Sequence, residues 1–200
     1  MVWLYFAFAV ASVASPKPFS VQFMQSISGR NVTVCIDGRF VETSFAGKLG
    51  FRDANHQWMS VCADVRAPVR PGQYFGVRAL SSSNFGGRVA KAGNIVARFF
   101  YEAQTPDQCA GLQVAVWKAL EDGADEADFS SGHFQVRASY AVISWAQHYY
   151  QALNTPGDAV YLQTGNGGGG AGQGGGTGGG GGGVAGGGGG GGGQSQFGVT

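Results

Sequence analysis

The chain has 200 residues, of which 37 are glycine, 13 are lysine or arginine and 12 are aspartate or glutamate. The formal net charge of +1 and the absence of a basic cluster argue against a nucleic-acid-binding protein. Because most of the glycines follow residue 165, the rest of the chain is long enough for a single domain with one hydrophobic core. Its many aromatic and small apolar residues and its few charges favour a packed domain over a disordered chain.

The chain begins with an apolar run, Met1–Ala14, which is too short to cross a bilayer as a helix. Small residues end the run, with Ser12 and Ala14 at positions compatible with cleavage, and Pro16 follows. This pattern is typical of a secretory signal peptide, although no lysine or arginine precedes the apolar run. We therefore expect residues 1–15 to be a signal peptide and the protein to be secreted or to lie at the cell surface, with no membrane span. A buried N-terminal strand or a misassigned start codon is the alternative.

The first half of the remaining chain predicts a β meander. Residues 31–36 are rich in β-branched side chains, Asp37 and Gly38 form a hairpin-type turn, and residues 39–45 alternate as a return strand. Glycine, proline and aspartate residues break the chain between the strands that follow. These further strands are predicted at residues 47–51, 57–65 and 73–80.

The second half changes to a helical period. Residues 87–100 place apolar side chains on one stripe, and residues 136–153 repeat that pattern. Between them, Thr105 can cap a helix whose first residue is Pro106, with Gln108 as the reciprocal partner of a capping box. This helix ends near Asp122, and a closing strand is predicted at residues 159–163.

These elements predict an α+β fold. We expect a β-sandwich or barrel-like N-terminal half, followed by the helical segment, within one domain of residues 16–164. Residues 165–200 are dominated by glycine, and we expect them to form a disordered tail.

One polar residue, Gln113, lies within the apolar helix that follows Pro106. It shares a helix face with Cys109 and Trp117, four residues before and after it. An unpaired buried amide costs about 1–3 kcal/mol, so the residue needs an explanation. Either its side chain bonds to the backbone, or it is no longer a free amide.

The chain has three cysteines, Cys35, Cys62 and Cys109. In an oxidising compartment they cannot all pair within one chain, so one is left for chemistry or for an intermolecular bond. Their spacing does not resemble a zinc or haem site, and His56, His133 and His148 are too scattered to indicate a metal. We therefore expect no metal and no cofactor.

Two stretches together resemble the thioester domains of bacterial surface and exported proteins. The first is Trp58–Val65, in which Cys62 is followed by Asp64 and, further on, by the turn at residues 69–74; the second is the helix Ala110–Trp117. The resemblance covers about residues 30–163. It implies an internal thioester between a cysteine sulfur and the side-chain carbonyl carbon of Gln113. Val114 is larger than the small residue usual at its position.

The resemblance leaves two cysteines in competition for the bond. We prefer Cys62, because the downstream turn and strand match as well, and keep Cys35 as the alternative. If Cys62 is used, Cys35 and Cys109 remain as the partners of a disulfide. A bond between Cys109 and Gln113 on the same helix ranks last, because its spacing does not fit such a motif.

The implied chemistry is single-turnover capture and not enzymatic turnover. A thiolate held against an amide carbonyl in a dry pocket can displace ammonia, and the stored thioester then reacts with an amine on a protein or with a small amine. Trp58, Tyr74 and Trp117 would exclude water, and Asp64 or His56 would handle protons, unless Asp64 instead braces the backbone. Two alternatives stay open: a non-reactive structural or binding module of the same fold, and a small secreted hydrolase with a cysteine nucleophile.

Overall fold

The structure is a computed structural model that describes residues 17–123, 125–164 and 195–199. The expected signal peptide and residues 165–194 of the expected tail lie outside the described residues. The described residues form an α+β fold with a sheet of seven strands and three α-helices, which confirms the predicted class. The strands are β1 (Phe19–Ile36), β2 (Arg39–Arg52), β3 (Gln57–Cys62), β4 (Tyr74–Ser81), β5 (Phe134–Arg137), β6 (Val160–Thr164) and β7 (Ser195–Val199).

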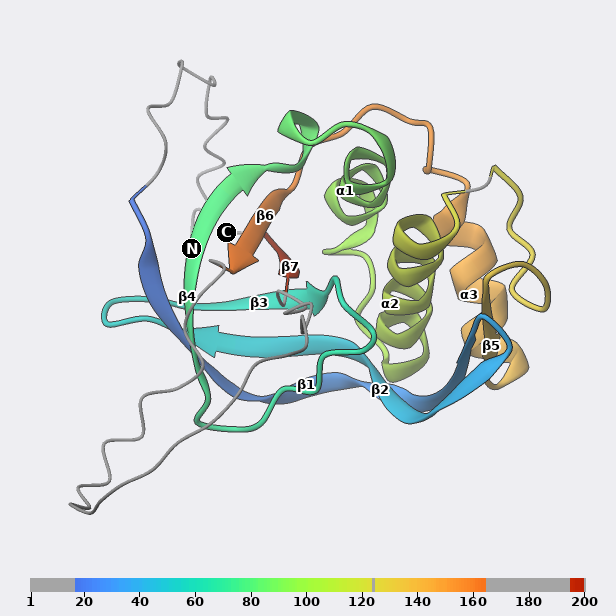
Figure 1. Ribbon diagram of the computed structural model, residues 1–200, viewed down its shortest axis with the longest axis horizontal. Helices are drawn as coiled ribbons and strands as arrows, with labels where there is room; N and C mark the ends of the chain where they lie inside the picture. Colours follow the sequence, from blue (N-terminus) through green and yellow to red (C-terminus); the bar gives the residue numbers. More distant parts are fainter. Residues whose placement is uncertain (1–16, 124, 165–194, 200) are drawn as a thin grey trace, which may run out of the picture.

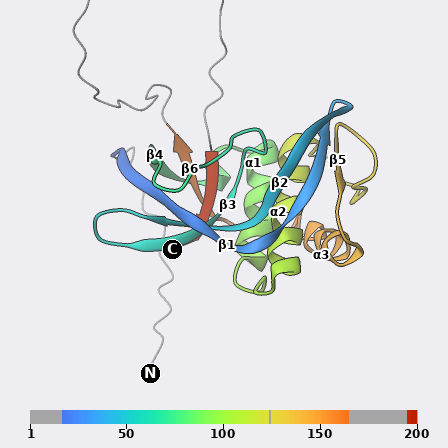
Figure 2. The same cartoon turned by 90° about the horizontal axis from the view of Figure 1, so that it is seen from below.

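The strands pair in the order β2-β3-β7-β6-β4-β1-β5, and β2 also pairs with β1. Each of these pairings is antiparallel. Strand β1 is long enough to pair with β4 at its beginning and with β5 at its end. Figure 2 shows the long β1–β2 ribbon running from the vicinity of β4 toward β5, alongside α2.

The predicted hairpin between β1 and β2 is confirmed. Asp37 and Gly38 have φ values of 52° and 73°, the positive angles that a tight two-residue hairpin turn requires. The predicted strand at residues 47–51 is not separate, because it continues β2 along β1. At Gly29 the two strands approach so closely that an added Cβ would lie 2.0 Å from the carbonyl oxygen of Ala46.

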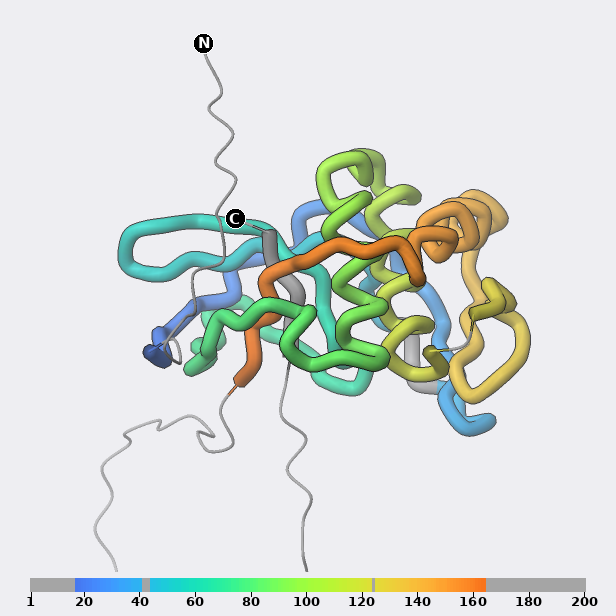
Figure 3. The backbone as a smooth tube through the Cα atoms, turned by 90° about the horizontal axis from the view of Figure 1, so that it is seen from above, coloured from blue at the N-terminus to red at the C-terminus, as the bar shows by residue number. Residues whose placement is uncertain are grey.

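The helices are α1 (Gly87–Phe99), α2 (Pro106–Glu121) and α3 (Tyr140–Tyr150), and a short 3-10 helix, η1 (Ser82–Asn84), precedes α1. Figures 1 and 3 show α2 between α1 and α3, on one side of the strands. Every residue from Cys109 to Ala119 is buried, because neighbouring elements cover α2 all round. The predicted capping box is confirmed: the N–H of Gln108 donates to the Thr105 hydroxyl, and the N–H of Thr105 donates to the Gln108 side chain.

Two sequence expectations fail. The third helix begins only at Tyr140, because residues 134–137 pair with β1 as strand β5 and Ser139 then caps the helix. The expected disordered tail is wrong for Ser195–Val199, which lies as β7 between β3 and β6. The folded unit therefore does not end at residue 164. Within the part of the chain that the structure describes, no helix is long and apolar enough to cross a membrane.

Candidate functional site

The end of β3 meets the middle of α2 through Cys62 and Gln113. The N–H of Cys62 donates to Oε1 of Gln113 at 2.7 Å, and Nε2 of Gln113 donates to the Cys62 carbonyl oxygen at 2.6 Å. Gln113 is only 1% exposed and Cys62 only 8% exposed. The buried side-chain amide of Gln113 therefore has two backbone partners. Both belong to Cys62, the cysteine that the resemblance pairs with Gln113.

A tight turn after β3 fixes the orientation of Cys62. The carboxylate of Asp64 accepts the N–H of Arg66 at 2.8 Å, and the Asp64 carbonyl accepts the N–H of Ala67. The Cys62 thiol donates to the same Asp64 carbonyl at 3.1 Å. Asp64 thus braces the backbone around the thiol through its carboxylate and its carbonyl, the alternative to a proton-transfer role for this residue.

Burial raises the pKa of the Cys62 thiol to about 12. The thiol is therefore protonated at neutral pH, and the nucleophilic thiolate form is scarce. The described contacts bring no histidine to it: His56 is exposed in the β2–β3 loop and interacts with Asp53. Within the described part of the chain, the hydrogen bonds of Cys62 go to Gln113 and Asp64 and not to a histidine. His56 precedes β3, whereas Cys62 ends it, so His56 is not placed to move the thiol proton.

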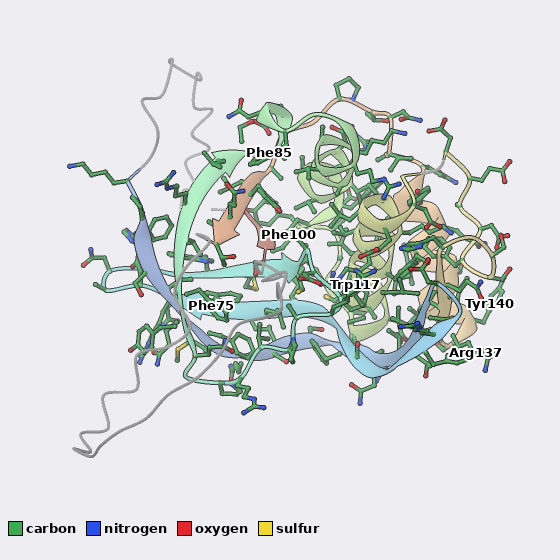
Figure 4. The ribbon with its side chains drawn as sticks, in the orientation of Figure 1. Phe75, Phe85, Phe100, Trp117, Arg137 and Tyr140 are labelled. Carbon is green, nitrogen blue, oxygen red and sulfur yellow. The ribbon has the colours of Figure 1, made fainter. Side chains whose placement is uncertain are left out.

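The aromatic residues expected around the site lie in three different settings. Trp117 follows Gln113 by one helical turn and is buried, and Figure 4 labels it among the side chains packed around α2. Trp58 lies four residues before Cys62 on β3, about 13 Å along an extended strand, and packs edge-to-face on Phe19. Tyr74 is 66% exposed on β4, so the expectation that it excludes water from the site is wrong.

An ion pair that the sequence did not predict joins the turn after β3 to the end of α2. The guanidinium of Arg66 binds both carboxylate oxygens of Glu121, at 2.5 Å and 3.0 Å. The carboxylate raises the pKa of Arg66 by hydrogen bonding, and the same carboxylate lies 3.2 Å from Nε2 of His133. The other ring nitrogen of His133 contacts Asp37 at the hairpin turn. No spacing in the sequence signals a pair separated by 55 positions.

Among the described residues, the thiols of the other two cysteines have no hydrogen bond to the Gln113 side chain. Cys35 is on β1 between Phe40 and Gln135, and it lines a cavity of about 140 Å³ with Arg137. The Cys109 thiol donates to the carbonyl of Ala103 at 3.3 Å. All three cysteines are free, so the expected disulfide between Cys35 and Cys109 is not formed. Cys35 therefore packs where β1 pairs with β5, and Cys109 packs at the start of α2.

No group of three or more histidine, cysteine, aspartate and glutamate side chains among the described residues could hold a metal ion. Comparisons of the chain with protein-family models, with curated proteins and with solved structures found no match. The case for a function therefore rests on the sequence resemblance and on the geometry of the site.

Proposed function

We propose that this protein is a surface or secreted domain that stores an internal thioester between Cys62 and Gln113 and uses it to capture an amine-bearing target covalently. The observation that carries the proposal is the pair of hydrogen bonds between the Gln113 carboxamide and the backbone of Cys62. Of the three cysteines, Cys62 is the one with described hydrogen bonds to that carboxamide. The sulfur belongs to the same residue whose backbone N–H and carbonyl hold the amide.

The bond-forming step balances without a cofactor. The sulfur of Cys62 attacks the Gln113 carbonyl carbon, the carbon–nitrogen bond breaks, and ammonia leaves with the thiol proton. An amine then attacks the thioester, forms an amide with the Gln113 side chain and returns the Cys62 thiol. The raised pKa of that thiol opposes the first step, because a thiolate is the stronger nucleophile, but it makes the thiol a protonated product after capture.

Burial supports storage of the bond. Both partners are almost completely shielded, and the ion pair between Arg66 and Glu121 holds the covering turn against α2. Burial of both residues would slow hydrolysis of a thioester in this position by limiting the access of water. The proposal includes the β-sandwich or barrel-like N-terminal half that the sequence predicts.

A second candidate, a non-reactive binding or structural module, is favoured by the same two hydrogen bonds. They satisfy Gln113 as an ordinary core amide, so the residue has a structural role even without chemistry. A cysteine hydrolase receives less support, because burial keeps the Cys62 thiol protonated and the described hydrogen bonds of Cys62 include none to a histidine.

Intact mass of the reduced, full-length chain separates these candidates. The thioester predicts a deficit of one ammonia, and incubation with methylamine replaces the deficit by a methylamine adduct on Gln113. Cys62→Ala is the sharpest variant, because it removes the sulfur and keeps the backbone groups that Gln113 binds. Cys35→Ala and Cys109→Ala are the matched controls and should retain the deficit.

An unmodified mass in the wild-type chain would reject the thioester and leave the non-reactive module. Loss of the deficit in Cys35→Ala but not in Cys62→Ala would assign the bond to the other cysteine. Turnover of a peptide or thioester substrate, abolished by Cys62→Ala, would instead support the hydrolase.

A further inference from the structure

A second cysteine, Cys109, faces a lysine in the core. Lys48 lies on β2 and is only 6% exposed, and its ammonium group lies 4.5 Å from the centre of the Phe100 ring. Its Nζ donates to the carbonyl oxygen of Ala103, and no ion pair among the described residues joins it to a carboxylate. Lysine is rarely buried without such a partner, so this position requires an explanation.

The Cys109 thiol binds the same oxygen atom. Its sulfur lies 3.3 Å from the Ala103 carbonyl oxygen and is completely shielded from solvent. Because Lys48 Nζ and Cys109 Sγ are both hydrogen-bonded to one oxygen, the amine and the thiol are close neighbours. They come from different elements, β2 and the first turn of α2, so a bond between them would join the sheet to the helix.

Burial also changes the reactivity of the amine. It lowers the pKa of Lys48, since the apolar surroundings disfavour the ammonium ion, and the neighbouring Cys109 opposes this effect only in part. A larger share of Lys48 is therefore the neutral amine at a given pH, and the neutral amine is the form that attacks an electrophile.

We propose that Lys48 and Cys109 form an oxidative modification site, at which hydrogen peroxide joins Sγ of Cys109 to Nζ of Lys48 in a sulfenamide bond. In the first step a local opening of the fold admits peroxide, and the thiol sulfur attacks it. The oxygen–oxygen bond breaks, and a sulfenic acid and one water form. In the second step the amine attacks that sulfur, the sulfur–oxygen bond breaks, and a second water leaves with a proton from the amine. Sulfur is oxidised by two electrons, peroxide is reduced, and a thiol reductant restores both side chains.

The geometry favours this outcome over further oxidation. A sulfenic acid on Cys109 would form within reach of an amine that is already held at the same carbonyl, and proximity replaces a bimolecular encounter. Cys35 and Cys62 have no described hydrogen-bond contact with a lysine. The site uses neither Cys62 nor Gln113, so it does not depend on the proposed thioester.

The test treats the full-length chain carrying Cys35→Ala with hydrogen peroxide, which removes Cys35 as a disulfide partner. We expect the intact mass to fall by two hydrogen atoms, trypsin to stop cutting after Lys48, and the two peptides that contain Lys48 and Cys109 to be recovered as one linked species. Dithiothreitol should reverse all three changes. The variant that adds Lys48→Gln should lose the link and carry sulfinic acid on Cys109.

Recovery of Cys109 as a free thiol or a sulfinic acid, with normal cleavage after Lys48, would overturn the proposal. A linked species heavier by one oxygen would overturn the direct sulfur–nitrogen bond. If the double variant does not fold, as judged by circular dichroism, the same peptide map of peroxide-treated wild-type chain still decides between a Lys48–Cys109 link and a disulfide.

Discussion

The carboxamide of Gln113 binds the backbone of Cys62 on both sides, as acceptor at 2.7 Å and as donor at 2.6 Å, and neither bond uses the sulfur. The contact that orders the site is therefore separable from the chemistry proposed for it. A variant that removes the sulfur tests reactivity, whereas a variant that removes the amide tests the connection between β3 and α2.

The first prediction concerns the stability provided by this contact. In the Cys62→Ala background, where no thioester can form, Gln113→Leu leaves the N–H and carbonyl of residue 62 buried without a partner. We expect the free energy of unfolding to fall by about 2–4 kcal/mol, measured by chemical denaturation, because each unsatisfied buried group costs about 1–3 kcal/mol. The Cys62→Ala chain is the control. Equal stability of the two chains would show that the amide is not needed to hold β3 on α2.

A buried ion pair at the end of α2 gives the second prediction. Lys118 Nζ lies 2.6 Å from the carboxylate of Asp122 and also donates to the carbonyls of Ser131 and Phe134, and both charged side chains are buried. Removing one partner leaves the other charge uncompensated, so Lys118→Met should destabilise the protein by about 3–5 kcal/mol.

The matched control is the pair of Lys91 and Asp125, whose side chains are 31% and 74% exposed, so Lys91→Met should cost much less than Lys118→Met. Thermal and chemical denaturation of both variants provide the measurement. Similar losses for the two lysines would contradict a special role for the buried pair.

Local signals in the sequence predicted the parts of the fold that depend on neighbours in the chain. The turn at Asp37 and Gly38 and the cap at Thr105 are confirmed because a few adjacent residues decide each of them. The start of α3 was wrong because residues 136 and 137, which fit the helical spacing, pair with β1 as the end of β5, and this pairing prevails. Composition alone missed β7, since a glycine-rich segment precedes five residues that pair with two strands.

The site was predictable only where a sequence motif marked it. The motif named Cys62 and Gln113, and the structure brings these two residues into contact. Periodicity could not reveal the pair of Arg66 and Glu121, because two surface charges from distant segments meet only after the chain has folded. The solvent exposure of Tyr74 could not be predicted either, because a strand pattern does not show which face of the strand the rest of the fold covers.

Close packing between α2 and α3 gives the third prediction. A Cβ added at Gly111 would lie 2.6 Å from the Cβ of Trp145 and 3.0 Å from the backbone nitrogen of Ala146. Gly111→Ala should therefore destabilise the protein by about 1–3 kcal/mol, although alanine is the better helix former by about 1 kcal/mol. Gly76→Ala on β4 is the control, because an added Cβ there meets no atom within 4 Å. A Gly111→Ala chain as stable as the wild type would show that the helices separate without cost.

The fourth prediction follows from the lowered pKa of Lys48, which burial causes. The unfolded lysine binds its proton more tightly than the folded one, so the contribution of Lys48 to the free energy of unfolding should rise as pH increases through the folded pKa toward the ordinary lysine value of about 10.4. Lys48→Met removes this contribution, so the difference in free energy of unfolding, wild type minus variant, should increase over the same pH interval. Denaturation curves at several alkaline pH values compare the two chains; parallel pH profiles would contradict the burial effect.

Strand β7 gives the last prediction. It pairs Met59–Cys62 of β3 on one side and Val160–Gln163 of β6 on the other, with Cys62 opposite Gln196. Deleting Ser195–Val199 would leave two facing strand edges without partners, and unpaired edges expose backbone hydrogen-bonding groups that favour association with other chains. We expect the melting temperature to fall by several degrees and the shortened chain to self-associate, as measured by calorimetry and light scattering. Deletion of five glycines at residues 179–183 is the control and should change neither property. Equal melting temperatures for both deletions would show that the segment after residue 164 acts only as a tether, the result that its composition alone predicts.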